Sequence, residues 1–307
     1  MAHETVFKKQ AVEALVWNPD GIYVDATYGR GGHSKEILDC LGPGGKLMVI
    51  DKDPEAMAHA RAHFSNHDRV CFSQGSFADL KQHIAREGWV QVDGVLMDLG
   101  VSSPQLDQSD RGFSFMKEGP LDMRMDTSKG MTAAEWLDQA DEKEMSRVFK
   151  EYGEERFHRR IASAIAEKRR DTPLKTTSDL VHVIEESIPF RDKHKHPATR
   201  VFQAVRIFIN DELAEISQAL ESAVQSLTPG GRLVVISFHS LEDRLVKRFM
   251  KQKARGDQLP ARLPVRDDSL NRELKVLASK VRPPLAEVRA NPRARSAIMR
   301  VAERLAA

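Results

Sequence analysis

Three aspartates in the first third of the chain have the position and spacing of ligand-binding residues. Asp25, Asp51 and Asp98 each follow a short apolar run that is typical of a buried strand. In an open parallel sheet, nucleotide-like ligands bind where the strands reach their carboxyl ends. Asp51 lies 22 residues after Gly29, an offset that lets a carboxylate accept hydrogen bonds from both ribose hydroxyls of an adenosine. The spacing predicts an adenosine-containing cofactor.

A glycine-rich loop over residues 29–34 follows the first of these runs. Its sequence, GRGGHS, departs from the G-x-G-x-x-G fingerprint of dinucleotide sites because Ser34 stands at the last glycine position. Asp25, just before the loop, would repel a pyrophosphate but could pair with an ammonium group. S-adenosylmethionine carries an ammonium, a sulfonium and an adenosine, and it has no phosphate. The carboxylates of Asp25 and Asp51 therefore fit this cofactor better than a dinucleotide.

The elements that must position these residues form an alternating pattern. Up to Asp98 the chain alternates four predicted strands with helices, which indicates a right-handed parallel α/β sheet. From about residue 107 to residue 200 the patterns are helical, with no convincing strand. Strand signal returns at residues 232–238. The economical interpretation is a helical domain inserted between the fourth and fifth strands of one sheet.

These patterns also predict the limits of the domains. We expect a cofactor domain made of residues 1–106 and 201–307, and an inserted helical substrate-recognition domain over residues 107–200. The second part of the cofactor domain should open with one long amphipathic helix over residues 201–227. A strand over residues 296–301 is expected to close the sheet at an edge.

The composition is typical of a globular protein with a core. Of the 307 residues, 41% are apolar and 30% are charged. No run of about 18 apolar residues is present, so a membrane span is not expected. No secretory signal is visible at the N-terminus. Cys40 and Cys71 are therefore expected to be buried free thiols, and the predicted location is cytoplasmic.

Basic residues are concentrated in two stretches although the net charge is only +2. From Arg244 to the C-terminus there are 17 Lys/Arg against 6 Asp/Glu, a local charge of +11. Residues 156–200 hold 11 basic against 6 acidic residues and four histidines. One such stretch alone is best read as a solvated face, but two favour a polyanion partner.

Several longer motifs resemble those of the bacterial ribosomal RNA small subunit methyltransferase H (MraW) family. The resemblance covers nearly the whole chain, except for residues 252–289. The matching motifs are Gly29–Ser34, Asp98–Asp107, Arg111–Phe115, Gly119–Met125, Tyr152–Arg156, His196–Arg200, Phe202–Ile207, Ser237–Arg244 and Asn291–Ser296.

The resemblance implies a class I, Rossmann-like methyltransferase that uses S-adenosylmethionine. Its implied reaction is N4-methylation of a cytosine in the decoding centre of small-subunit (16S) ribosomal RNA. The implied partner is that RNA or the assembled small subunit, with no membrane and no metal, while homodimerisation stays open. The family's cofactor contacts fall on Gly31, Gly32, His33, Asp51, Phe77, Asp98 and Gln105.

The candidate catalytic residues are Asp98 and Ser102. The exocyclic amine of cytosine is a poor nucleophile because its lone pair is delocalised into the ring. An enzyme must hold this amine in line with the methyl group and accept hydrogen bonds from its N–H groups. Asp98 and the loop over residues 102–104 could do this. The stacking partner of the base is left open among Phe113, Phe115 and Phe238.

Other interpretations compete with this one. A DNA amino-methyltransferase would use the same catalytic chemistry. A non-catalytic RNA-binding assembly factor could retain the fold. A nicotinamide oxidoreductase is disfavoured by Ser34 and Asp25.

His59, His63 and His67 recur every four residues, but no further ligand completes a metal set. His239 could act as a base, contact phosphate or cap the helix that follows it.

Overall fold

The computed structural model describes residues 5–190, 196–257 and 270–306, and it divides the chain into two compact units. The first unit contains the residues up to Gly100 and those from Leu213 onward. The second unit is the segment between them, Val101–Glu212. Within the described ranges, every helix is too short or too polar to cross a membrane.

A seven-stranded sheet forms the centre of the first unit, in the order β3-β2-β1-β4-β5-β7-β6. Strands β1 to β5 are parallel, whereas β7 runs antiparallel to both of its neighbours. The strands are β1 Ile22–Asp25, β2 Lys46–Asp51, β3 Val70–Gln74, β4 Val92–Asp98, β5 Leu227–Ser237, β6 Leu274–Val281 and β7 Ile298–Arg304.

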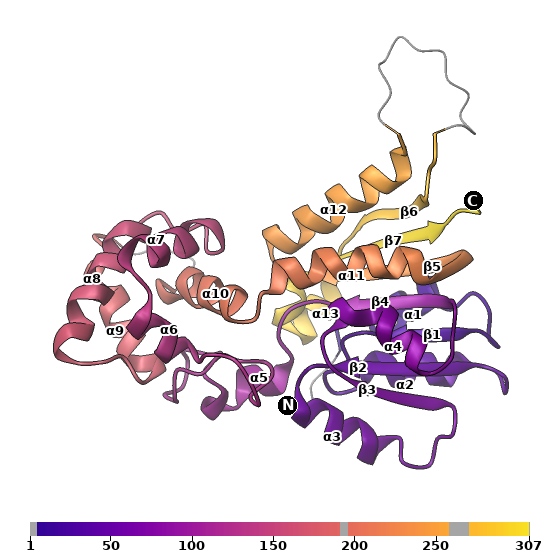
Figure 1. Cartoon of the computed structure of the whole chain (residues 1–307), viewed down its shortest axis with the longest axis horizontal. Helices are drawn as coiled ribbons and strands as arrows, with labels where there is room; N and C mark the ends of the chain where they lie inside the picture. The colour runs from indigo at the N-terminus through magenta and orange to yellow at the C-terminus, as the bar shows by residue number, and fades with distance from the viewer. Residues whose placement is uncertain (1–4, 191–195, 258–269, 307) are drawn as a thin grey trace, which may run out of the picture. The chain divides into compact units, whose positions relative to one another are not determined.

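Helices cover both faces of this sheet because successive strand residues point to opposite sides. In β2, Leu47 and Val49 join the core beneath α1, α2 and α3, whereas Met48 and Ile50 join the core beneath α4, α11 and α12. The helices are α1 Lys8–Leu15, α2 Gly32–Cys40, α3 Pro54–His63, α4 Leu80–Arg86, α11 Glu212–Ser226 and α12 Ser240–Arg255 (Figure 1). Continuous apolar strands buried on both faces are typical of a parallel α/β sheet.

The second unit is helical and has its own core, formed by residues such as Phe149, Ile161, Ile184 and Val201. Its only strand-like pairing within the described residues is an isolated bridge between Pro120 and Thr176. Its helices are α5 Ser103–Asp107, α6 Ala133–Gln139, α7 Glu142–Glu151, α8 His158–Asp171, α9 Thr177–Ser187 and α10 Ala198–Ile209. The predicted Rossmann-like sheet with a helical insertion between its fourth and fifth strands is therefore confirmed.

The insertion forms a compact unit wider than the expected 107–200, because α10 packs against α7 and α9. Its role in recognising substrate stays a prediction.

The single long helix expected over residues 201–227 is wrong, because the chain breaks between α10 and α11. Asp211 has a positive φ of 50°, and the buried Asn210 side chain bonds elsewhere in the second unit. Its amide nitrogen donates to the Met123 carbonyl at 2.8 Å, and its oxygen accepts from the Met125 amide at 2.7 Å. These hydrogen bonds to residues distant in the chain stabilise the break, so the helix does not continue past Asn210.

Two further expectations need correction. The C-terminal strand β7 does not lie at the edge of the sheet, because β6 pairs with its outer side. Strand β6 shows little apolar alternation and is largely exposed, which explains why sequence periodicity did not predict it. The two cysteines are free but not buried: Cys40 is exposed at the end of α2, and Cys71 is partly exposed.

Candidate active site

The carboxyl ends of neighbouring parallel strands bring the three predicted aspartates to one edge of the sheet. Asp25 ends β1, Asp51 ends β2 and Asp98 ends β4, and β1 pairs with both other strands. The loop after β1 is bonded to both neighbours. The Asp98 amide donates to Thr27 Oγ1 at 2.6 Å, and the Gly29 amide donates to Asp51 Oδ2 at 2.8 Å.

Asp25 is fully buried, and its hydrogen bonds stabilise the glycine loop. Its Oδ2 accepts a hydrogen bond from Ser34 Oγ at 2.5 Å, and its Oδ1 accepts from the Thr27 amide at 3.2 Å. Burial raises the pKa of Asp25 to about 6, although these hydrogen bonds oppose the increase. A side chain without exposed surface cannot contact a ligand, so the expected direct pairing of Asp25 with an ammonium group is wrong.

The glycines of this loop are required by close packing within the protein. Gly31 has a φ of +74°, and a Cβ there would lie 2.6 Å from the Tyr28 ring. Gly32 begins α2, and a Cβ at this position would collide with the Thr5 side chain. These positions therefore need glycine even without a ligand, and their role as cofactor contacts stays a prediction.

Asp51 is only partly exposed, at the end of β2. It accepts hydrogen bonds from the amides of Gly29 and Asp53, at 2.8 and 2.9 Å. Burial, helped by the nearby charge of Asp53, raises its pKa to about 6. Phe77 lies in the short helix η1, Phe77–Asp79, just beyond the end of the neighbouring strand β3, and is partly exposed. Both residues are thus at the edge where the sequence predicted an adenosine.

Asp98 carries the clearest sign of an incomplete site. Its Oδ1 atom is buried and has no hydrogen-bond partner among the residues that the structure describes. Its Oδ2 lies 3.7 Å from Nδ1 of His33, and 24% of its side chain is exposed. Burial, together with the charges of Asp25 and Glu242, raises the pKa of Asp98 well above its ordinary value. An unpartnered buried carboxylate oxygen is costly, so a ligand donor would stabilise it.

His33 is a buried link between the N-terminal segment and Asp98. Its Nε2 lies 3.1 Å from the Val6 carbonyl, which can only accept, so this nitrogen carries a proton. Its Nδ1 faces the Asp98 carboxylate. The structure therefore places His33 next to Asp98, and its predicted contact with cofactor stays a prediction.

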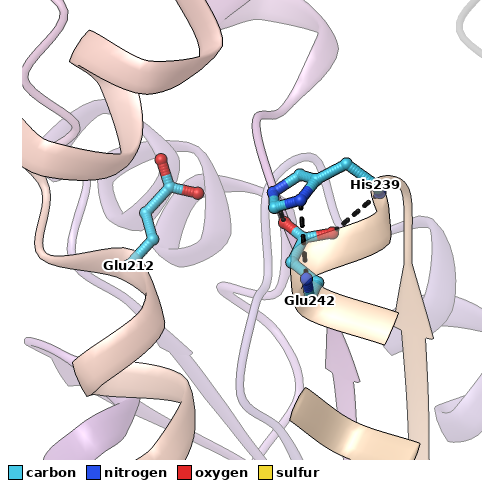
Figure 2. Close-up of side chains that lie close together, drawn as sticks. All are labelled: Glu212, His239 and Glu242. Atoms are coloured by element: carbon cyan, nitrogen blue, oxygen red, sulfur yellow. Dashed lines mark hydrogen bonds and ion pairs between the residues drawn. The ribbon is translucent and has the colours of Figure 1, made fainter. Parts of the chain in front are cut away.

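Glu242 is fully buried where β5 passes into α12, and sequence reasoning missed it. Its Oε2 accepts hydrogen bonds from the amides of Phe238 and His239, and its Oε1 lies 2.8 Å from His239 Nε2 (Figure 2). His239 is the N-cap of α12, so the capping interpretation is confirmed. A Glu three residues after an N-cap was the available signal. Glu212, also drawn in Figure 2, pairs with Arg206 inside the second unit.

Ser102 and Gln105 belong to the second unit and cap the short helix α5. Ser102 is its N-cap, and its amide donates to Gln105 Oε1 at 2.9 Å. Gln105 is buried. Their predicted roles in catalysis and cofactor binding stay predictions.

The motif after this helix supports the fold of the second unit. The buried Arg111 guanidinium donates to the carbonyls of Arg124 and Met125, at 3.1 and 3.0 Å. The guanidinium of Arg124 in turn forms a two-pronged pair with Asp122. Phe113 is buried, and Phe115 stacks on His196 at 4.6 Å.

The histidine series has a structural explanation. The Nδ1 atom of His59 is bonded to the Tyr28 hydroxyl at 2.8 Å, and His59 stacks on His63. Helix α3 ends at His63, so His67 is not on it.

Comparison with known proteins identifies the family of this chain. The family model of the MraW methylase family matches residues 1–305. The chain belongs to the MraW methylase family. It is 55% identical to the ribosomal RNA small subunit methyltransferase H of Thioalkalivibrio sulfidiphilus, with 99% of this chain and 98% of the relative covered. The protein is therefore an S-adenosylmethionine-dependent methyltransferase, and neither a non-catalytic assembly factor nor an oxidoreductase.

The solved structures that match this chain are more distant in sequence. A candidate rRNA methylase of Clostridium thermocellum is 12% identical, with a TM-score of 0.47 and coverage of 99% of this chain and 100% of that one. A Streptococcus mutans protein in complex with SAH is 11% identical, with a TM-score of 0.44 and coverage of 99% of both chains. The fold assignment rests on the strand order described above.

Residues of this MraW methylase fit S-adenosylmethionine. The cofactor has an ammonium group and two ribose hydroxyls that can donate hydrogen bonds, and it has no phosphate. The partly exposed carboxylate of Asp51 is an acceptor for the ribose hydroxyls at the edge of the sheet where such a ligand binds, and Asp98 lies at the same edge.

Proposed function

We propose that the protein methylates the exocyclic N4 atom of a cytosine in the decoding centre of small-subunit (16S) ribosomal RNA. The observation that carries the chemistry is Asp98, whose buried Oδ1 has no donor among the described residues and whose pKa is raised. The name of the 55% identical relative supports the RNA substrate. A target base reaches such an edge only from a single strand or after flipping out of a helix.

Asp98 acts on the amine. When bound, S-adenosylmethionine supplies the electrophilic methyl group. The Asp98 carboxylate accepts a hydrogen bond from the amine N–H, which holds the nitrogen in place and stabilises the positive charge that develops on it. Methylation leaves one proton too many on N4, and Asp98 takes that proton. A carboxylate with a raised pKa is suited to this step.

The remaining residues position the reactants. Asp51 accepts from the ribose hydroxyls, Phe77 lies beside the adenine, and the backbone at Gly31 and Gly32 forms the wall of the site. His33, whose Nδ1 lies 3.7 Å from the Asp98 carboxylate, is part of the same site. The roles predicted for Ser102 in catalysis and for Gln105 in cofactor binding belong to the same proposal.

The experiment offers assembled small subunits, protein-free rRNA and DNA to the wild type and to the Asp98→Asn variant. N4-methylcytosine is quantified by mass spectrometry, and cofactor binding is measured separately. We expect product on rRNA or on the subunit, and a single-turnover rate that falls about 100-fold or more in the variant at saturating cofactor. Product on DNA alone would replace the proposal by the DNA alternative. A variant with full rate would remove Asp98 from the chemistry.

A ribosomal substrate also supports a cytoplasmic location. Whether the protein methylates free RNA or the assembled subunit is decided by the same assay. Homodimerisation stays open and is measurable by light scattering.

A further inference from the structure

A cavity of about 430 Å³ lies between α12 and the edge strand β6 in the first unit, and its lining includes none of Asp25, Asp51 and Asp98. Its floor is apolar and includes Met250 and Val276. Five basic side chains line it: Arg300 is buried, whereas Lys247, Lys251, Arg255 and Lys280 are exposed. Figure 1 shows α12 running beside β6 and β7.

The exposed cations of this cavity have no ion-pair partner among the described residues, unlike Lys253 on the same helix. Lys253, on another face of the same helix, forms ion pairs with Glu221 and Glu273 at 2.9 and 2.8 Å. In contrast, the four exposed cations of the lining form no ion pair with any carboxylate in the described part of the chain. The one acidic residue in the lining, Asp243, is bonded through both oxygens to Arg300, at 2.8 and 3.0 Å. The cavity therefore keeps a strong positive charge.

The cations are arranged in a row that starts near the catalytic edge. Helix α12 begins at Ser240, shortly after β5 ends at Ser237. At 1.5 Å per residue, Lys247 lies about 10 Å along the helix, and Lys251 and Arg255 follow at steps of about 6 Å. A strand of RNA that leaves the catalytic edge along α12 would meet these cations in succession.

We propose that this cavity binds the sugar-phosphate backbone of the RNA substrate, at nucleotides some distance from the target cytosine. The inference rests on the proposed function and adds a second contact area to it. Phosphates match the four cations, and the apolar floor can accept the face of a sugar or base. Addition of an extended peptide to β6 is disfavoured, because Lys275 and Lys280 on this edge oppose strand pairing.

The test uses the triple variant Lys247→Gln, Lys251→Gln, Lys280→Gln. Affinities for protein-free small-subunit rRNA and for the assembled subunit are measured over a series of salt concentrations. Loss of three phosphate contacts should lower the slope of log affinity against log salt by about 2, since each contact to a single strand contributes about 0.7. The KM for RNA should rise more than kcat falls, and cofactor affinity should not change.

The matched control removes three exposed cations elsewhere in the same unit, by Lys9→Gln, Lys81→Gln and Arg86→Gln. It should retain the wild-type slope apart from a small general effect of net charge. If the two triple variants behave alike, the inference is wrong. It is also wrong if the cavity variant binds protein-free rRNA normally but the assembled subunit weakly, because the partner is then a ribosomal protein. Failure of the wild type to methylate small-subunit RNA would instead contradict the proposed function.

Discussion

The Ser34 hydroxyl donates a hydrogen bond to the fully buried Asp25 carboxylate at 2.5 Å. This bond joins the first turn of α2 to the end of β1, across the glycine loop. It explains why serine stands where dinucleotide-binding loops have glycine. The loop is held by a side-chain bond, and its shape does not depend on a pyrophosphate.

Ser34→Ala and Ser34→Gly should therefore both destabilise the protein, although glycine matches the dinucleotide fingerprint. Each leaves a buried carboxyl with one donor fewer, which costs about 1–3 kcal/mol. Urea unfolding measures the free energy, and Ser65→Ala, at an exposed serine, is the control. A Ser34→Gly protein as stable as wild type would show that this hydrogen bond makes no net contribution to the free energy of unfolding.

Cofactor affinity should increase as the pH rises through about 6. Asp51 has its pKa raised to about 6 by burial, and only its ionised form accepts hydrogen bonds from both ribose hydroxyls. Below that pH, affinity for S-adenosylmethionine should fall by up to about tenfold per pH unit. Calorimetry between pH 5 and 8 checks this.

Asp51→Asn should bind the cofactor about 10- to 100-fold more weakly at pH 8, because hydrogen bonds to a charged group are lost. It should also show a flatter pH dependence. Asp39→Asn, at an exposed position, is the matched control and should behave as wild type. If the Asp51 variant keeps the wild-type pH profile, another group controls binding.

The stability of the cofactor-free protein should show the opposite pH dependence. A folded-state pKa of about 6 lies above the ordinary value of 3.8, so Asp51 binds its proton more tightly in the folded state. Its stabilising contribution is complete below about pH 4 and is lost as the pH rises through 6. The free energy of unfolding of wild type relative to Asp51→Asn should thus fall between about pH 4 and pH 6. A constant difference would contradict the raised pKa.

The methylation rate should fall at acidic pH, where Asp98 becomes protonated. Glu242→Gln should move this fall to lower pH. The negative charge of Glu242 helps to raise the pKa of Asp98, and glutamine keeps an acceptor for the amides of Phe238 and His239 while removing the charge. Single-turnover rates against pH measure the shift. Glu13→Gln, which removes an exposed charge, should leave the profile in place.

Asn210→Ala should destabilise the second unit. The Asn210 amide bonds to Met123 and Met125 in the buried loop between α5 and α6, and its removal leaves a carbonyl and an amide unpaired. A loss of about 2–4 kcal/mol is expected, at about 1–2 kcal/mol for each orphaned group. Asn66→Ala, at an exposed turn, is the control. An equal stability for both variants would show that the loop relaxes around the change.

Local pattern and spacing were enough to predict the first four strands and their parallel arrangement, the helical insertion and the three aspartates at one edge. This worked because strand periodicity and the parallel βα alternation are properties of neighbouring residues. The break at Asn210 was not predictable in this way, since its cause is a hydrogen bond to residues more than 80 positions away. Strand β6 was missed because an exposed edge strand has no buried face to produce alternation.

The amino-acid sequence by itself determined the cofactor class and the family, because residue types, their offsets and long motifs carry that information. Only the tertiary structure decided what each carboxylate does. Burial and hydrogen-bond partners come from segments distant in the chain, and they make Asp25 a structural residue while leaving an oxygen of Asp98 without a donor. The same holds for the basic C-terminal stretch, where three-dimensional pairing with Glu221 and Glu273 separates Lys253 from the unpaired cations of the α12–β6 cavity.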